Sequence, residues 1–477
     1  MAVETQASPT SLPDYLRAAQ PNPSSNRGPW YLNTAPTYAG IFLWFVFWDQ
    51  MAGNGLPQGG LWMALLGVVI AGAICHFLFY LVPGLLGMKT GLPLYIVGAS
   101  TFGANGSLLM PGFLMGLLQF GWLAVNTYYS SQLLVGSSTS PFFYAVCVAW
   151  AAGAAFVGLK GIQYVAKVAM FLPLLPLIVL LIATSQFAGA AFDYPPPSVA
   201  DQVGTAPVGG LLLMVGAIVG FFATAGAAGV DFGMGNRDAR DVNFGGLAGI
   251  FGATVLTAGL AVVCVAGAWV KGDLPNQTAE AKLSADLDAI AAPYETKQEE
   301  IKKARFTLTR ALEATHSPNF FKLMMIGLTL AAFPGACFSS FIAANSFKTV
   351  MPRVNPFLSI GIGATVSILL AVTGVAGNLP AVFGFIGASF GPICGAMCAD
   401  YLLAGQKWAG PRAGFNPAGW LAWLLGFIVG ILPNLGVAIP AAPVLAFVVG
   451  FVVYFGLAKA KLESPIIPYG PATAQQE

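Results

Sequence analysis

The stretch GAIVGFFATAGAAGVDFGMGNRD, from Gly216 to Asp238, decides how the rest of the chain is read. It is apolar enough to cross a lipid bilayer, yet five glycines fall between positions 216 and 233 and Asp231 stands near its end. Glycine at this density lets a helix unwind inside the membrane, or lets neighbouring helices pack closely. The residues alone leave both interpretations open.

The first apolar stretch of the chain, AGIFLWFVFWDQMAGNGLPQGG (39–60), has a similar character. It carries Asp49 and Gln50, followed by glycines and Pro57, which predicts a break over residues 53–57. Broken helices at the start of each half mark the midplane site of transporters built from inverted repeats. Asp49, Gln50 and Asp231 are therefore candidate coupling or gating residues. A carboxylate such as Asp49 must face water or a partner, or be protonated, and an ordinary acid at a helix end is the alternative interpretation.

The composition places these two stretches in a membrane protein. Of 477 residues, 57% are hydrophobic and only 8% are charged, whereas soluble domains are roughly 25% charged. The apolar runs are continuous and about 20 residues long, which is the length of a helix that crosses the bilayer. We therefore predict an all-α integral membrane protein with about 12 transmembrane helices. The predicted spans are 36–53, 61–85, 107–134, 142–159, 164–187, 209–230, 245–270, 320–346, 356–376, 379–399, 416–434 and 440–458.

These spans predict a domain organisation of two five-helix repeats. Residues 1–34 form a polar N-terminal tail, 35–187 the first repeat and 209–400 the second. Residues 416–458 form two accessory helices and 459–477 a C-terminal tail. By eye the two predicted repeats share no sequence identity, so this division depends on the placement of the glycines.

Short loops with Lys and Arg alternate with loops that have almost none, and the positive-inside rule then places both termini in the cytoplasm. The expected location is the plasma or inner membrane, and the expected oligomeric state is a monomer. The formal net charge of +2 shows no nucleic-acid footprint. The predicted partners are therefore a small-molecule substrate and the lipid bilayer.

The connection 271–318 stands apart because it holds seven of the 21 Lys and Arg on the predicted external side. Long loops are translocated regardless of charge, so the topology stands. Glu299 precedes Lys303 by four residues, and Leu308 and Leu312 have the same spacing, which predicts a short amphipathic helix. This helix is either a solvated cap or a lid over an outer entrance.

The segment FLMGLLQFGWLAVNTYY (113–129) places three polar or aromatic groups on one helical face. Gln119, Trp122 and Asn126 are spaced i, i+3 and i+7. Lipid cannot satisfy amides, so this face must look into the helix bundle. An indole and a neighbouring amide match a flat heteroaromatic ligand with adjacent donor and acceptor atoms. The alternative is hydrogen bonding between helices around a packed indole.

Four motifs in order resemble the purine–cytosine permeases of the nucleobase–cation symporter family. They are GNGL (53–56), TGLPLYIVGASTFGANGSLLMPGFLMGLLQFGW (90–122), GFFATAGAAGVDF (220–232) and GPICGAMCADYLL (391–403). The resemblance covers most of residues 35–460. It implies ten helices in two inverted repeats of the leucine-transporter type, two further C-terminal helices, and alternating access.

The resemblance also implies a substrate site. By motif position, Trp122 and Phe222 would sandwich a base, and Gln119 would pair with its edge. Phe221 and Ala225 would line the same site, and Asn126 shares the face of Gln119 and Trp122. Stacking tolerates any flat ring, so the amides would have to select which ring binds.

The eighth span departs from the family pattern. Ala331, Ala332, Phe333 and Pro334 stand where cytosine-type members carry polar residues. Hydroxyls for a sodium site are then missing, whereas a proton needs only one titratable group. We therefore predict coupling to H⁺, with Asp49 as the best-placed carrier, or uncoupled transport.

The sequence thus predicts a secondary active transporter that imports a nucleobase, namely cytosine, a purine or a related flat heterocycle. The alternative is a transporter of another small solute, such as an allantoin- or hydantoin-like ring or a vitamin, sodium-coupled or uncoupled. No HExxH, GxSxG or paired-aspartate motif indicates an enzyme, and no filter repeat indicates a channel. We expect no cofactor and no metal site, because the six cysteines lie in apolar segments and are read as packing residues.

Overall fold

The computed structural model describes residues 12–160, 172, 174–195, 207–272, 274 and 306–469. The longer helices are α2 (Thr34–Phe42), α3 (Phe45–Ile74), α4 (Leu81–Thr90), α7 (Leu114–Val135), α8 (Pro141–Lys160), α10 (Leu174–Phe187), α11 (Pro207–Ala227), α13 (Ala239–Gly246), α14 (Ala253–Lys271), α17 (Leu308–Thr315), α18 (Pro318–Val350), α19 (Pro356–Val372), α20 (Leu379–Leu403), α21 (Pro417–Ile431) and α22 (Ala442–Lys459). Short helices are α1 (Asp14–Arg17), α5 (Leu94–Val97), α6 (Ala99–Phe102) and α12 (Gly229–Gly233). π-Helical turns at Cys75–Tyr80, Leu108–Phe113 and Leu247–Gly252 lead from or into neighbouring helices.

Ten helical runs among the described residues are long and apolar enough to cross a membrane. One of them, Phe45–Thr90, has 46 residues, or about 69 Å of helix, whereas the hydrocarbon core is about 30 Å thick. Gly60 interrupts this run with φ 69° and ψ −179°, a conformation that suits glycine. The run therefore holds the end of the first crossing and all of the second. With the shorter apolar helix α19, the twelve predicted crossings are accounted for, although part of the fifth lies outside the described residues.

The break in the first span is not where the sequence predicted it. The helix continues through residues 53–57, with Pro57 inside it, and the interruption lies at Leu43 and Trp44, between α2 and α3. Trp44 is extended, with ψ 124°. Gly55 serves close packing instead, because a side chain there would lie 2.8 Å from Met214 of α11. Gly55 therefore brings α3 and α11 together, and the next interruption of the helix is at Gly60, beyond the predicted break.

The sixth span is interrupted at Ala228, between α11 and α12. Its glycines also allow close contact. A Cβ on Gly233 would lie 2.1 Å from the carbonyl oxygen of Gly84 on α4, and one on Gly229 would lie 2.9 Å from the ring of Tyr80. The sequence left two interpretations of this stretch open, an interrupted helix and close packing between helices. The structure shows both.

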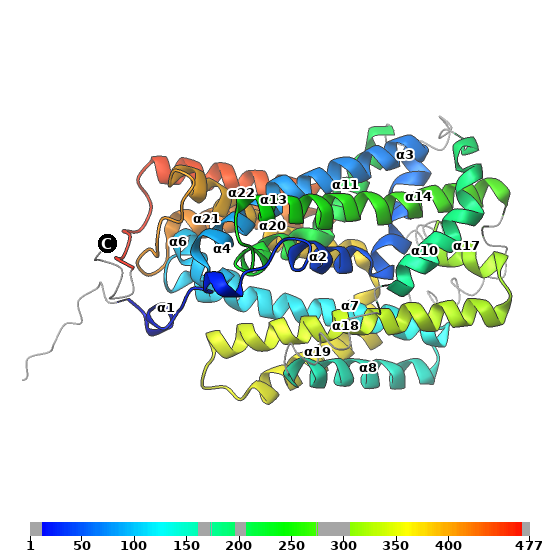
Figure 1. Cartoon of the computed structure of the whole chain (residues 1–477), viewed down its shortest axis with the longest axis horizontal. Coiled ribbons are helices and arrows are strands. Elements are labelled where there is room, and N and C mark those ends of the chain that lie inside the picture. The colour runs from blue at the N-terminus through cyan, green and yellow to red at the C-terminus, as the bar shows by residue number, and fades with distance from the viewer. Residues whose placement is uncertain are drawn as a thin grey trace, which may run out of the picture.

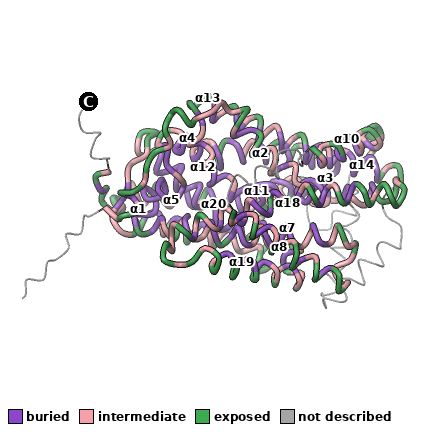
Figure 2. Tube along the Cα trace, turned by 60° about the horizontal axis from the view of Figure 1, so that its bottom comes forward, coloured by how far each residue is buried: buried purple, intermediate pink, exposed green. Residues whose placement is uncertain are grey.

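The helices lie roughly parallel in an elongated bundle (Figure 1), with buried residues along α11, α12 and α20 and exposed residues along outer helices such as α13 and α19 (Figure 2). Both described chain ends lie at one end of the bundle, which we call the terminal face, and α17 lies at the opposite end, which we call the loop face. In α17 the predicted amphipathic helix is confirmed for its described part, with Leu308 and Leu312 fully buried. Glu299 and Lys303 lie outside the described residues.

The N-terminal segment crosses the terminal face and ties several spans together. Asn22 contacts both Gly91, at the end of α4, and Met234, after α12. Tyr15 donates a hydrogen bond of 2.5 Å to the carbonyl oxygen of Ala104. Burial raises the pKa of Tyr15 to about 12, so its hydroxyl keeps this proton at neutral pH.

Candidate functional site

Four aromatic side chains from different helices meet beside the break in the first span, and we call them the aromatic cluster. Trp44 stands at the break, Trp122 on α7, Phe221 on α11 and Phe383 on α20. The ring centroid of Trp122 lies 6.0 Å from that of Trp44 and 5.2 Å from that of Phe221. It lies 5.8 Å from the centroid of Phe383. The cluster thus joins the first, third, sixth and tenth crossings at one point.

Trp122 is fixed within this cluster by a hydrogen bond. Its indole N–H donates to the hydroxyl of Thr224 on α11 over 3.1 Å. Thr224 is buried and Trp122 is half-buried. The bond links α7 to α11 and sets the orientation of the indole ring.

Of the two phenylalanines of α11, the one that contacts Trp122 is Phe221. Phe222 is fully buried and stacks on Phe42 of α2, with centroids 5.6 Å apart and 14° between the planes. Neighbouring residues on a helix point about 100° apart; both rings reach Phe42, at 6.0 Å for Phe221 and 5.6 Å for Phe222, but of the two only Phe221 has a ring contact with Trp122 among the described residues. The described residues show no direct contact between the rings of Trp122 and Phe222, and the implied sandwich of a base between them stays a prediction.

Ala225 lies one turn beyond Phe221 on α11, and its carbonyl oxygen accepts a hydrogen bond from Tyr38 of α2 over 2.9 Å. Tyr38 is fully buried and its ring also packs on Phe222. This part of α11 therefore holds α2 in place next to the break, and Phe222 belongs to that packing.

Gln119 lies one turn from Trp122 on α7 and is buried. Its amide nitrogen contacts the thioether sulfur of Met115 at 3.5 Å. Sulfur is a weak acceptor, so this contact leaves much of the hydrogen-bonding capacity of the amide available to a ligand.

The amide of Asn126 is fully engaged in joining helices. Its nitrogen donates to the carbonyl oxygen of Ala332 on α18 over 3.0 Å, and its oxygen accepts from the indole of Trp150 on α8 over 3.0 Å. The hydroxyl of Ser130 donates to the same oxygen over 3.3 Å. The geometry matches the alternative interpretation of this residue, namely hydrogen bonding between helices.

Asp49 is buried in α3 and holds the start of helix α17. Its carboxylate accepts the backbone N–H of Thr309 over 2.7 Å and the hydroxyl of Thr309 over 3.1 Å. Gln50 donates to the same carboxylate over 3.0 Å, and Arg310 of α17 adds a favourable charge interaction. A negative charge at a helix N-terminus satisfies unpaired N–H groups and complements the helix dipole. Asp49 therefore attaches the loop-face helix to the first crossing.

Asp231 occupies a related position towards the terminal face. Its carboxylate accepts the backbone N–H of Leu94, the first residue of α5, over 3.0 Å. It thereby joins the end of the sixth crossing to the segment between the second and third crossings. Asp49 and Asp231 lie on different crossings, and each binds a short helix near one face of the bundle.

Two oxygens of the eighth crossing take part in hydrogen bonds in the region where the sequence showed the departure. The carbonyl of Ala332 accepts from Asn126, and Thr329 donates its hydroxyl hydrogen to Met325. Within the described residues, no group of three or more His, Cys, Asp or Glu could hold a metal ion.

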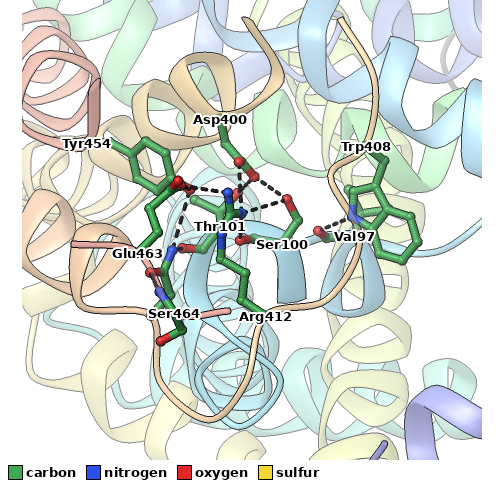
Figure 3. Close-up of polar contacts among 10 residues, drawn as sticks. Val97, Ser100, Thr101, Asp400, Trp408, Arg412, Tyr454, Glu463 and Ser464 are labelled. Carbon is green, nitrogen blue, oxygen red and sulfur yellow. Dashed lines mark hydrogen bonds and ion pairs between the residues drawn. The ribbon is translucent and has the colours of Figure 1, made fainter. Parts of the chain in front are cut away.

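A second polar cluster lies at the terminal face and is buried (Figure 3). Arg412 is 5% exposed and binds Asp400 at the end of α20 over 3.0 Å and Glu463 after α22 over 2.6 Å. Ser100 and Thr101 both donate to Asp400. Burial acts to lower the pKa of Arg412, but the neighbouring acids outweigh it and the pKa is raised. We call Ser100, Thr101, Asp400, Arg412 and Glu463 the terminal cluster.

Several residues of the aromatic cluster and the terminal cluster were not predicted from the sequence. Trp44 and Phe383 were two apolar aromatics among many, and Thr224 was one hydroxyl in a glycine-rich span. Arg412 was read only as a loop charge. Arg412 stands six residues before the apolar stretch that begins at Ala418, and Asp400 lies in the apolar span just before it. A charge of each sign so close to a span is the signal that would have predicted an ion pair between these two residues.

The fold is similar to that of known membrane transporters. The structure of Mhp1, a nucleobase-cation-symport-1 family transporter, in a closed conformation with bromovinylhydantoin bound, matches with a TM-score of 0.61 and 16% identity over 95% of this chain and 96% of that one. An inward-facing conformation of Mhp1 matches with a TM-score of 0.60 and 16% identity over 93% and 94% of the chains. A substrate-bound, outward-open Na⁺-coupled sialic acid symporter matches with 0.55 and 14% identity over 95% and 93%. No protein-family model and no curated protein sequence matches the chain.

These likenesses show the fold, which is that of the leucine transporter, with ten helices in two inverted repeats and two additional C-terminal helices. The chain is a multi-pass membrane protein with this fold.

Proposed function

We propose that this chain is a secondary active transporter that moves a nucleobase or a related flat heterocycle across the membrane by alternating access. The observation that carries the proposal is the aromatic cluster, because Trp122 and Phe221 meet Trp44 at the interruption of the first crossing. Stacking on aromatic side chains contributes about 1–3 kcal/mol per base. A flat ring is the ligand that this site fits best.

The selectivity of the site is assigned to Gln119. Its buried amide has only a thioether contact, and an amide offers a donor and an acceptor side by side. The edge of a nucleobase presents the complementary pair. Asn126, whose amide is engaged by three partners, is assigned to holding α7 against α8 and α18.

A hydantoin-like ring is the second candidate substrate. One similar structure contains bromovinylhydantoin, which is also flat and carries neighbouring carbonyl and N–H groups. Both candidates require the same aromatic surfaces, so a panel that includes both rings separates them.

The coupling proposal centres on Asp49 and H⁺. Protonation would remove the charge that favours the N-terminus of α17, and would weaken the attachment through Thr309. Proton binding and release of the loop-face helix would then be linked. The side chains of Ala331, Ala332 and Phe333 offer no oxygen to a sodium ion, which supports the proposal of proton coupling.

The orientation follows from the charges at the two faces. Lys89 stands at the end of α4, Arg353 between α18 and α19, Lys407 between α20 and α21, and Lys461 after α22. These parts of the chain lie at the terminal face (Figure 1). By the positive-inside rule we place the terminal face in the cytoplasm and α17 outside.

Uptake of radiolabelled nucleobases and hydantoins into proteoliposomes tests the proposal. We expect saturable uptake of one or a few rings, lost in Trp122→Ala. Trp62 is the matched control, because its side chain is 68% exposed on the outside of the bundle, and Trp62→Ala should retain uptake. Absence of uptake for every ring, with folded protein in the vesicles, would refute the proposal.

A further inference from the structure

Most of the buried and half-buried tryptophans that the structure describes donate their indole N–H groups within the protein. The N–H groups of Trp48, Trp122, Trp150, Trp408, Trp420 and Trp423 each donate to a protein oxygen. The indole nitrogen of Trp44 is buried and finds no acceptor among the described residues. A buried donor without a partner is unfavourable, and native structures rarely keep one without a reason.

This donor stands in the candidate substrate site. Trp44 lies edge-on to Trp122, with 74° between the planes, and nearly parallel to Phe221, at 22°. It occupies the two-residue interruption between α2 and α3 and has an extended backbone. Trp48, one turn along the same crossing, bonds instead to the carbonyl oxygen of Leu43. Two indoles of one span thus differ in whether the protein satisfies them.

We propose that the indole N–H of Trp44 is a specificity-determining donor that binds a carbonyl oxygen on the edge of the transported ring. This inference rests on the proposed function. Stacking accepts any flat ring, whereas a donor that only the ligand satisfies selects rings that carry an acceptor. An exocyclic carbonyl oxygen is the strongest neutral acceptor on such rings, and it can approach an N–H to about 2.9 Å. The site would therefore prefer oxo-heterocycles over analogues of the same size without the oxygen.

Matched ligand pairs measure this preference directly. Cytosine and 4-aminopyrimidine differ in one carbonyl oxygen, as do hypoxanthine and purine. Some of these pairs will bind to the purified wild-type protein. For each such pair, we expect the ring with the carbonyl oxygen to bind more tightly than the ring without it. Trp44→Phe keeps an aromatic ring and removes the donor, so affinity for the oxo member should fall about fivefold to 100-fold. Affinity for the partner without the oxygen should fall by less, because that ring loses only part of a stacking surface.

Two controls separate binding from folding. Trp48→Phe removes an N–H that is satisfied within the protein, so it should lower the melting temperature and leave the oxo preference intact. Trp44→Phe loses some packing but no protein hydrogen bond, so it should lower the melting temperature of the ligand-free protein less than Trp48→Phe does. If Trp44→Phe does not fold, replacing Trp44 with 3-benzothienylalanine changes only the N–H to sulfur, and should abolish the preference in the same way.

The outcomes are distinct. An oxo preference that survives in Trp44→Phe or in the benzothienyl variant overturns the assignment of Trp44 and leaves the transporter proposal standing. An equal loss of affinity for both members of a pair also overturns the assignment, because Trp44 then acts only as a stacking surface. If folded wild-type protein binds no ring at all, the proposed function falls and this inference falls with it.

Discussion

At the scale of single residues, the position of one phenylalanine changes which side chain is assigned to the substrate. Phe221 contacts Trp122, whereas Phe222 is packed between α2 and α11 against Phe42 and Tyr38. The two neighbours thus have different surroundings and should have different roles. Mutating each separately distinguishes a binding residue from a core residue.

We predict that Phe221→Ala weakens ring binding about five- to 150-fold, since one stacking surface contributes about 1–3 kcal/mol. Phe222→Ala should instead lower stability, by about 3–5 kcal/mol for a buried phenylalanine. Equilibrium binding and melting temperature in detergent measure the two effects. A large loss of binding in folded Phe222→Ala with normal binding in Phe221→Ala would reverse the assignment.

Gln119→Leu should reduce the affinity for the preferred ring more than for poor substrates. The lost hydrogen bond is worth about 1–3 kcal/mol if the amide reads the ring edge. Competition of unlabelled rings against a labelled substrate gives the ratios. Equal weakening of all rings would make Gln119 a structural residue.

At the scale of elements, hydrophobic length was enough to predict the crossings, because a helix in lipid needs about 20 apolar residues. The interruption of the first crossing was not predictable from composition. It falls at Leu43 and Trp44, two bulky residues, whereas Gly53, Gly55 and Pro57 remain inside a helix. A glycine signals either a break or a close contact, and only the neighbouring helix decides which of these occurs.

The same limit applies to the candidate site. Helical spacing correctly placed Gln119 and Asn126 on buried positions and Trp122 on a half-buried position of one helix. It could not predict which of the two amides would bind another helix. Asn126 meets Ala332 and Trp150, residues distant in sequence, so its partners depend on how α7, α8 and α18 pack. Asp49 and Thr309 are 260 positions apart, so no local sequence pattern could predict their hydrogen bond.

Asp49→Asn tests the link between the first crossing and α17. The asparagine can still accept a hydrogen bond, but it carries no charge and binds no proton in the physiological range. We expect uptake in Asp49→Asn to lose its sensitivity to a proton ionophore, while wild-type uptake persists when sodium is replaced by choline.

Glu313→Gln is the matched control, since it removes an exposed acid that pairs with Arg310 on the same helix. It should keep the ionophore response. Strong sodium dependence of wild-type uptake would contradict proton coupling. Ionophore sensitivity in Asp49→Asn would retain the proton and assign it to another group.

At the scale of the whole molecule, the terminal face is held by contacts between distant parts of the chain. The N-terminal segment reaches Gly91 and Ala104, and the segment after α22 reaches Arg412 through Glu463. The tenth and twelfth crossings and the segment before the third are thus joined through one guanidinium (Figure 3). Stability of this face should depend on the buried charges more than on the exposed ones.

We predict that Asp400→Asn destabilises the protein by up to about 3–5 kcal/mol, because breaking a buried ion pair leaves Arg412 under-compensated. Glu463→Gln should cost less, since its side chain is 25% exposed. Asp14→Asn, which breaks a pair with Arg17 in which Asp14 is 96% exposed, should cost about 0–1 kcal/mol. Melting temperatures in detergent should therefore fall in the order Asp14→Asn, Glu463→Gln, Asp400→Asn, with the largest drop last. The reverse order would contradict the role of the terminal cluster.

The terminal cluster also has a consequence for biosynthesis. Ser100 and Asp400 are 300 positions apart, so a ribosome that adds about 5–20 residues per second makes the second roughly 15–60 s after the first. Glu463 follows later still, beyond the last helix. A nascent chain therefore holds polar groups without their partners until translation is almost finished. A chain that ends before position 463 has a buried arginine that lacks one of its two acids.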